Sequence, residues 1–227
     1  MQRLRVRYAK RGRLRFTSHR DFSRAFERAL VRARLPMAYS SGFNPHPRIS
    51  YAGAAPTGSA SEAEYLEIGL AERVEPADVH AALDRALPDG LDVVAVVESD
   101  GGALADLLEA SHWVVDLPQT PVEEARRAVG EFLAAESVPV ERMTKKGLRE
   151  LDARAPVVSL TATEAGPGSR LDLVLRHAVP AVRTDDVLTG LRSVAGLDPG
   201  PALLLTRLAQ GPLHDDGTVG DPLVGSR

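Results

Sequence analysis

The sequence predicts an α+β protein built from two tandem ferredoxin-like domains, each with the element order β-α-β-β-α-β and an antiparallel sheet. Three observations lead to this prediction. Charged and apolar residues alternate with period 2 where strands are expected, apolar residues recur at helical spacing between them, and the same order of elements returns in the second half. A chain of 227 residues is long enough for two domains of about 100 residues each.

The first domain is expected over residues 1–99. Its helix at about 19–34 begins behind Ser18, which forms a capping-box pattern with Asp21, and it ends before Pro36. A second helix begins with a proline in its first turn. The expected elements are strands at 3–8, 13–16, 49–53, 63–70 and 91–98, with helices at 19–34 and 76–87. The short strand at 13–16 is predicted because RLRF repeats the alternation of RLRVRY after a turn.

The second domain is expected over 103–213, after a Gly/Asp-rich linker at 99–102, and residues 214–227 are expected to form a flexible tail. The expected elements are strands at 111–118, 138–144, 155–165, 170–177 and 202–211, with helices at 121–136 and 184–196. This domain has one strand more than the β-α-β-β-α-β pattern requires, so the stretch 138–165 is its least regular part.

The net charge of −3 conceals a strong asymmetry along the chain. Residues 1–50 hold 13 Arg and Lys against two acidic residues, a local charge of +11, which leaves −14 for the remainder. The basic residues are mostly arginine, the side chain best suited to bidentate phosphate contacts and to stacking on bases. This composition favours a nucleic-acid partner for the N-terminal half.

Other function classes are excluded by composition. The chain has no cysteine, which excludes disulfides, thiolate catalysis and its own iron–sulfur cluster. No apolar run approaches the roughly 20 residues of a membrane helix, and the basic N-terminus lacks the apolar region of a secretory signal, so we expect a cytoplasmic protein without membrane contact. Walker and GxGxxG nucleotide motifs are missing.

The arginines of the first strands and helix are expected to hold RNA phosphates. Tyr39 and Phe43 are suited to stacking on a base. A Lys-Lys-Gly turn in the second half is the candidate for a second phosphate contact. The expected nucleic-acid-binding residues are Arg5, Arg7, Lys10, Arg13, Arg15, Arg20, Arg24, Arg28, Tyr39, Phe43, Asn44, Arg48, Lys145 and Lys146.

The segment SSGFNPHPR at 40–48 is the most unusual loop. Two prolines bracket His46 and restrict the backbone, while Gly42 permits a positive φ where the chain turns. His19 and His46 are the candidate catalytic residues, because neutral imidazoles beside phosphates suit metal-independent RNA cleavage. The alternative is structural: His19 in the first turn of a helix and His46 as a rigid surface contact, since no third catalytic group is evident. Their spacing does not indicate a metal site.

The pattern YxKxGxLRFxSHxD, followed by an arginine-rich helix, YSxGFNPHPRIS and PTGSxSEAEY, resembles the radical SAM-linked proteins, an uncharacterised bacterial domain family (DUF2344-like). The match is dense over residues 1–70, and farther along it consists mainly of Thr144-Lys145-Lys146-Gly147 with Asp152. One departure is Arg20, where the family pattern favours leucine. The matching residues include Lys10, Gly12, Phe16, Ser18, His19, Asp21, Arg24, Tyr39, Ser40, Gly42, Phe43, Asn44, Pro45, His46, Pro47, Gly58, Ser61, Glu62 and Glu64.

The resemblance implies association with a radical SAM enzyme, with S-adenosylmethionine and the iron–sulfur cluster held by that partner and no cofactor in this chain. We therefore expect an RNA-binding accessory protein, non-catalytic rather than an enzyme, that works with a radical SAM enzyme in modification or processing of tRNA or rRNA. Two alternatives stay open. One is an enzyme that cleaves or modifies RNA through His19 and His46, and the other is a protein-interaction adaptor that does not bind RNA.

Overall fold

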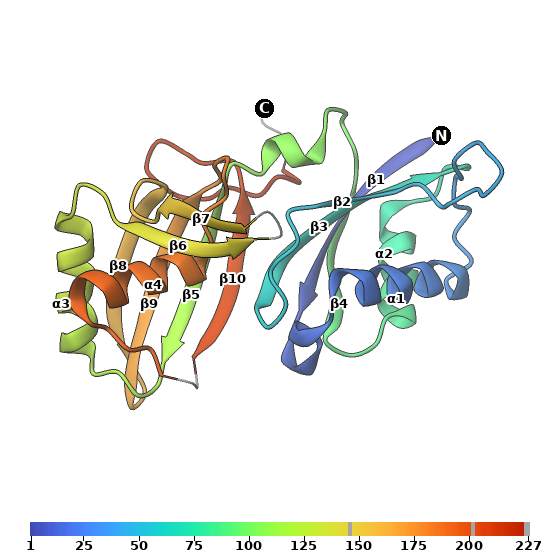
Figure 1. Cartoon of the computed structure of the whole chain (residues 1–227). Coiled ribbons are helices and arrows are strands. Elements are labelled where there is room, and N and C mark those ends of the chain that lie inside the picture. The colour runs from blue at the N-terminus through green and yellow to red at the C-terminus, as the bar shows by residue number, and fades with distance from the viewer. Residues whose placement is uncertain (145–146, 201–202, 225–227) are drawn as a thin grey trace. The chain divides into compact units, whose positions relative to one another are not determined.

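The computed structural model describes residues 1–144, 147–200 and 203–224, and the chain forms two compact units (Figure 1). Unit 1 comprises Met1–Leu108 with the described part of the C-terminal segment from Asp221, and unit 2 comprises Glu109–Gly220. The chain thus passes from one unit to the other at residue 108, beyond the 99–102 segment expected as the linker. In unit 2, Leu213 forms a β-bridge with Val219, a residue of the segment expected as the tail.

The predicted mixture of helices with mainly antiparallel strands is confirmed. In unit 1, β1 pairs with β3 and with β4, and β2 pairs with β3, all antiparallel, which gives the strand order β4-β1-β3-β2. The elements are β1 (Gln2–Lys10), the 3₁₀ helix η1 (Gly12–Phe16), α1 (His19–Arg32), β2 (Ile49–Ala52), β3 (Ala60–Leu70), α2 (Pro76–Ala86), β4 (Leu91–Glu98) and the 3₁₀ helix η2 (Leu104–Leu107).

The core of unit 1 follows from the alternation in β1. Leu4, Val6 and Tyr8 face the helices and are buried against α1 and α2. The ring of Tyr8 stacks on Phe22 of α1 with 4.5 Å between centroids, and Phe26 is buried one turn later. The opposite face of β1 therefore carries the alternate residues, which include the strand arginines.

The prediction of a strand at 13–16 is wrong, because RLRF forms part of the 3₁₀ helix η1. Gly12 has a φ of +54°, which turns the chain out of the direction of β1. The carbonyl of Arg15 then accepts a hydrogen bond from the N–H of Gly58 at 2.8 Å, and Leu14 packs on the core. An alternation of only four residues cannot distinguish a strand from a short turn of helix anchored by contacts from elsewhere.

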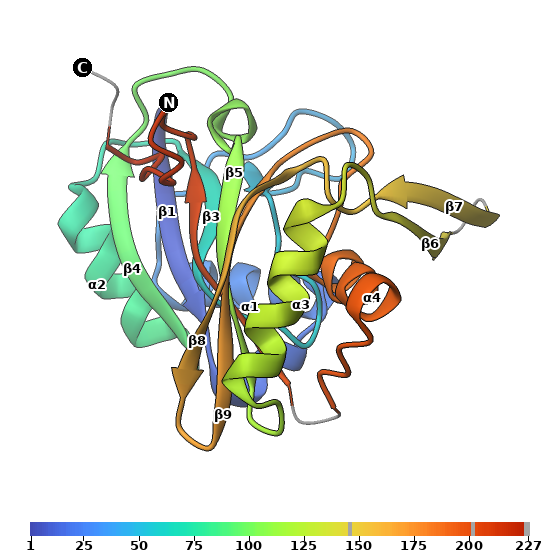
Figure 2. The same cartoon turned by 90° about the vertical axis from the view of Figure 1, so that its left-hand side faces the viewer.

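Unit 2 begins with β5 and α3, and its strands follow the order β10-β5-β9-β8 with antiparallel pairing. Figure 2 shows α3 and α4 next to one another, and the two helices are in contact. The elements are β5 (Ala110–Leu117), α3 (Val122–Ala134), β6 (Pro139–Thr144), β7 (Gly147–Asp152), β8 (Val157–Ala165), β9 (Gly168–Arg176), α4 (Thr184–Ala195) and β10 (Leu204–Gly211).

The strand in excess belongs to a separate hairpin. β6 pairs with β7 in a two-stranded sheet of its own, and Arg142 of β6 attaches the hairpin to α4 through an ion pair with Asp186. Sequence reasoning missed β7, because GLRELD has one buried residue, Leu151, and too many charged residues to resemble a strand. Among the described residues, no helix combines the length and apolar character needed to cross a membrane.

Candidate nucleic-acid interface

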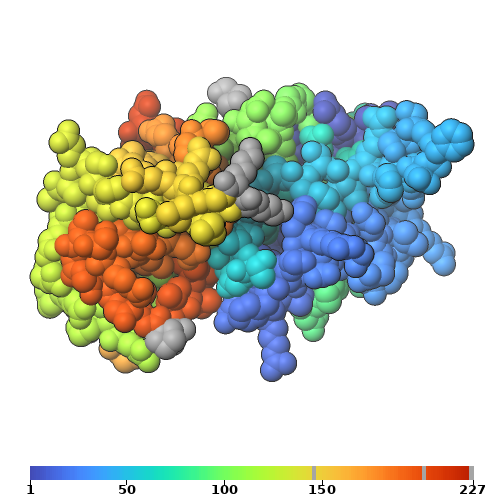
Figure 3. Space-filling model, in the orientation of Figure 1, coloured from blue at the N-terminus to red at the C-terminus, as the bar shows by residue number. Residues whose placement is uncertain are grey.

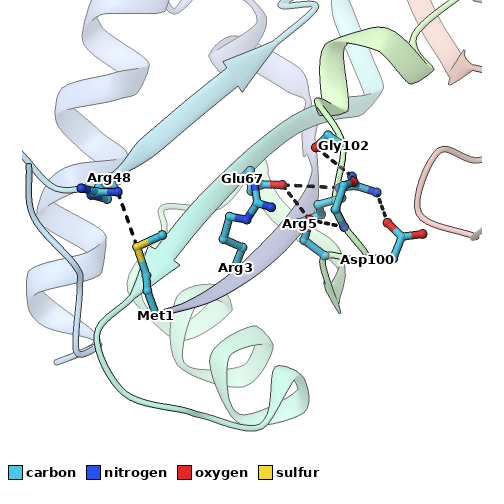
Figure 4. Close-up of polar contacts among 9 residues, drawn as sticks. Met1, Arg3, Arg5, Arg48, Glu67, Asp100 and Gly102 are labelled. Atoms are coloured by element: carbon cyan, nitrogen blue, oxygen red, sulfur yellow. Dashed lines mark hydrogen bonds and ion pairs between the residues drawn. The ribbon is translucent and has the colours of Figure 1, made fainter.

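Two basic residues of β1, Arg5 and Lys10, lie in the protein interior rather than on a phosphate-binding face. Arg5 is only 3% exposed, and Lys10 is also buried. Figure 4 shows the guanidinium of Arg5 between Glu67 and Asp100, with Nη1 at 2.8 Å from the Asp100 carboxylate and Nε at 3.5 Å from that of Glu67. It also donates to the carbonyl oxygen of Gly101. These contacts neutralise the charge and leave no open surface for a polyanion.

The neighbouring arginines of this segment are paired as well. Arg7 donates through Nε to the carbonyl oxygen of Glu62 at 2.8 Å and lies 3.3 Å from the carboxylate of Asp221. Arg11 forms ion pairs with Glu62 and Asp92, which raise the pKa of its guanidinium above its ordinary value. We therefore leave Arg5, Arg7 and Lys10 out of the candidate interface, although all three were expected in it.

The arginines of α1 behave differently. Ser18 caps this helix by accepting a hydrogen bond from the N–H of Asp21 at 3.2 Å, as the sequence predicted. Phe22 and Phe26 are buried, so the row Arg20, Arg24 and Arg28 faces solvent at i, i+4 spacing. Their side chains form no hydrogen bond or ion pair with any described residue. Each of the three guanidinium groups is therefore available to an external anion.

A groove runs beside this row, between α1 and the end of α2, with a volume of about 880 Å³. Arg24, Arg28 and Arg32 line it from α1, and Arg85 lines it from α2. Arg32 donates to the carbonyl oxygen of Ala86, which links the two helices at the groove. The sequence did not indicate Arg85, because only the fold brings the end of α2 next to α1.

The loop at 40–47 is pinned at its base. Tyr39 forms a β-bridge with Pro47, and Ser40 and His46 are joined by two hydrogen bonds, from the Ser40 N–H to the His46 carbonyl at 2.9 Å and from the His46 N–H to Oγ of Ser40 at 3.0 Å. Gly42 has the predicted positive φ, +134°. The pinned loop holds the ring of Phe43 fully exposed, and the light-blue segment projects from unit 1 in Figure 3.

The two histidines lie on different elements. His19 is the first residue of α1, and its ring meets Tyr51 edge-on with 4.9 Å between centroids. Burial raises the pKa of the Tyr51 hydroxyl. His46 lies in the loop that follows the other end of α1, where its backbone is hydrogen-bonded to Ser40. The ring and hydrogen-bond contacts of the described residues do not join the two imidazoles.

The remaining expected residues are spread over two places. Arg13 and Arg15 belong to η1 just before α1, where the guanidinium of Arg15 lies 4.6 Å from the ring centroid of Phe16. Arg48 donates to the carbonyl oxygen of Tyr39 at 3.3 Å, and Asn44 is exposed in the loop. Lys145 and Lys146 lie outside the described residues. Across the described ranges, no three His, Asp or Glu side chains are grouped so that they could hold a metal ion.

Residues 3–184 match the family model described as an uncharacterized protein conserved in bacteria (DUF2344). The match covers all of the candidate interface on α1, the groove and the loop. The search of the curated proteins found no match.

Proposed function

The chain belongs to the uncharacterised bacterial family DUF2344, and we propose that it is an RNA-binding accessory protein whose interface is the outer face of α1 together with the loop at 40–47. The observation that carries the proposal is the contrast between two sets of arginines. Those of β1 are paired with carboxylates, whereas Arg20, Arg24 and Arg28 have no partner among the described residues.

Three unpaired guanidinium groups on successive turns are suited to a phosphate backbone. Residues four apart on a helix have Cβ atoms about 6 Å apart, so the row presents a regular line of positive charge. Arginine binds phosphate oxygens bidentately, and an uncompensated row is strongly attractive to a polyanion at low salt. Arg13 of η1, exposed just before α1, lengthens the basic surface at its N-terminal end.

The loop supplies the complementary, uncharged contact. The exposed ring of Phe43 is held on a backbone fixed by the Tyr39–Pro47 bridge, so little conformational entropy is lost when it stacks on a base. Tyr39 is also exposed at the base of the loop. Stacking contributes about 1–3 kcal/mol per base and tolerates any base, which suits a module that positions RNA for another protein.

The proposed partner is a radical SAM enzyme, which would hold the S-adenosylmethionine and iron–sulfur chemistry, and tRNA or rRNA is the proposed substrate class. The partnership rests on the sequence resemblance alone. We also infer that each unit is a ferredoxin-like domain. The inference is supported by the strand order of unit 1, β4-β1-β3-β2, which recurs in unit 2 as β10-β5-β9-β8 once the β6–β7 hairpin is set aside.

The proposal is tested by fluorescence anisotropy with labelled tRNA over a range of KCl concentrations. The variant R20A/R24A/R28A removes the unpaired row. The matched control R73A/R126A/R192A removes three exposed arginines that each have a carboxylate partner, so both variants have a formal net charge of −6 instead of −3. We expect loss of affinity and a shallower salt dependence only in the first variant.

Equal weakening in both variants would attribute binding to net charge and remove the α1 face from the proposal. No binding by the wild-type protein at 50 mM KCl would leave the protein-interaction adaptor as the better description. Incubation of wild type and of H19A/H46A with total RNA addresses the enzyme alternative, because cleavage lost in the variant while binding persists would establish catalysis.

A further inference from the structure

The α1–α2 groove differs chemically from the arginine row beside it, because it combines charge with an apolar surface. Its lining includes four guanidinium groups and the carboxylate of Glu27, a net charge of +3. The same groove is also lined by Val31, Leu87 and Pro88. A site for inorganic phosphate alone would have no use for this apolar surface, whereas a group with an anionic end and a flat apolar body matches both parts.

Val31 is the residue that most needs explanation. It is 72% exposed on a helix whose other large apolar residues are buried, and it lies one turn after Arg28 and directly before Arg32. A single exposed valine is ordinary in itself. Here it lines, together with the exposed Pro88, a concave site of the size that usually holds a small ligand or one unit of a polymer.

The groove is also fixed in place. Arg32 donates to the carbonyl oxygen of Ala86, where α2 ends, so α1 and α2 are joined at the groove itself. Arg24, Arg28 and Arg85 are free of partners among the described residues and line the same groove. A ligand therefore meets a preformed wall and three uncommitted guanidinium groups.

We propose that this groove binds one nucleotide unit of single-stranded RNA, with the phosphate on Arg24, Arg28 and Arg85 and the unstacked base against Val31 and Pro88. The inference rests on the proposed RNA-binding function and specifies its substrate class. In a duplex the bases are stacked and paired, so only phosphates and sugars reach the protein and the apolar part of the groove stays unfilled. A single strand fills both parts, since an unstacked base packs on apolar side chains or guanidinium planes.

The experiment compares a labelled 12-nucleotide RNA strand with the same strand annealed to its complement, in fluorescence anisotropy at 150 mM KCl. The variant V31N/P88S makes the apolar surface polar without changing charge. Val194→Asn is the control, because Val194 is a partly exposed valine on α4 of unit 2 and does not line the groove. We expect V31N/P88S to bind the single strand about tenfold more weakly and the duplex within twofold of wild type.

Equal loss of affinity for the single strand and the duplex in V31N/P88S, or no loss for either, would overturn the inference. If the wild type still binds RNA in that case, the proposed function stands. Failure of wild type to bind either form would contradict the proposed function itself. Adenosine monophosphate is added as a competitor, and displacement of the strand at micromolar concentrations of this nucleotide would identify a site for free nucleotides and would also overturn the inference.

Discussion

Mutation of the paired arginines of β1 should reduce stability, whereas mutation of the exposed arginines of α1 should reduce RNA affinity. The variants Arg5→Met and Arg24→Ala compare the two sets most directly. Methionine preserves the apolar stem of Arg5 but leaves its acceptors without a donor. Removing one partner of a buried ion pair costs about 3–5 kcal/mol. The value here should be lower, because Asp100 is 67% exposed and returns to water, while Glu67, at 13%, keeps its hydrogen bond from Ser99. We expect a loss of about 2–3 kcal/mol in the free energy of unfolding.

Arg24→Ala should change the free energy of unfolding by less than about 0.5 kcal/mol, because an exposed, unpaired side chain is replaced by a better helix former. It should instead weaken RNA binding. For a single strand, each phosphate contact adds about 0.7 to the slope of log K against log salt, which at about 150 mM salt corresponds to roughly fourfold in affinity. Arg5→Met, by the same reasoning, should leave RNA affinity within twofold of wild type.

Unfolding is followed by circular dichroism in urea, because the single tryptophan, Trp113, lies in unit 2 and its fluorescence does not report on unit 1. RNA affinity is measured by anisotropy on the same protein samples. If Arg5→Met proved as stable as wild type, the buried ion pairs would not be structural. If the folded Arg5→Met variant lost as much RNA affinity as Arg24→Ala, β1 would belong to the interface and the division between the two sets would be refuted.

Two further predictions concern unit 2. Burial alone would raise the pKa of Asp152, but hydrogen bonds from two backbone N–H groups hold it below its ordinary value, so Asp152→Ala should cost about 1–3 kcal/mol at pH 7. A lowered carboxyl pKa stabilises the fold at pH values above the unfolded-state pKa, and this stabilisation is lost on acidification. Urea titrations should therefore show a smaller difference in unfolding free energy between wild type and variant at pH 3 than at pH 7. A difference independent of pH would contradict this. Gly190→Ala places a Cβ 2.8 Å from the ring of Phe132 and should destabilise unit 2 by about 1–3 kcal/mol. The Cβ of Gly130→Ala meets no atom within 4 Å, so this variant should stabilise the protein by up to about 1 kcal/mol. Equal thermal stability of the two variants would refute the packing argument.

The sequence predicts best where local chemistry decides the structure. Ser18 and the spacing of Phe22 and Phe26 predict the start and the buried face of α1, and Gly42 predicts the turn in the loop that follows. These signals depend on residues within a few positions of one another. Phe43 was expected to stack on a base because of its residue type, whereas the full exposure of its ring is visible only in the structure.

The sequence fails where the deciding partner is distant. RLRF at 13–16 alternates like a strand, and the helical turn depends in part on the distant hydrogen bond from Gly58 to Arg15. Likewise, Arg85 enters the groove from α2, a helix that begins 44 residues after α1 ends. Neither contact has a signature in the local pattern.

The charge asymmetry of the chain explains both the success and the failure of the expected interface. The carboxylates that pair with Arg5, Arg7 and Arg11 all come from beyond residue 50, so the acidic remainder neutralises part of the basic segment within the protein. The pairing is selective: it reaches β1 and the turn after it but not the exposed face of α1, where no carboxylate from another element forms an ion pair with Arg20, Arg24 or Arg28 among the described residues. Pairing these exposed guanidinium groups with carboxylates would add little stability to the fold, since a surface ion pair contributes only about 0–1 kcal/mol. Folding therefore places no strong demand on this row, and its affinity for anions is the property that a substitution there would change most.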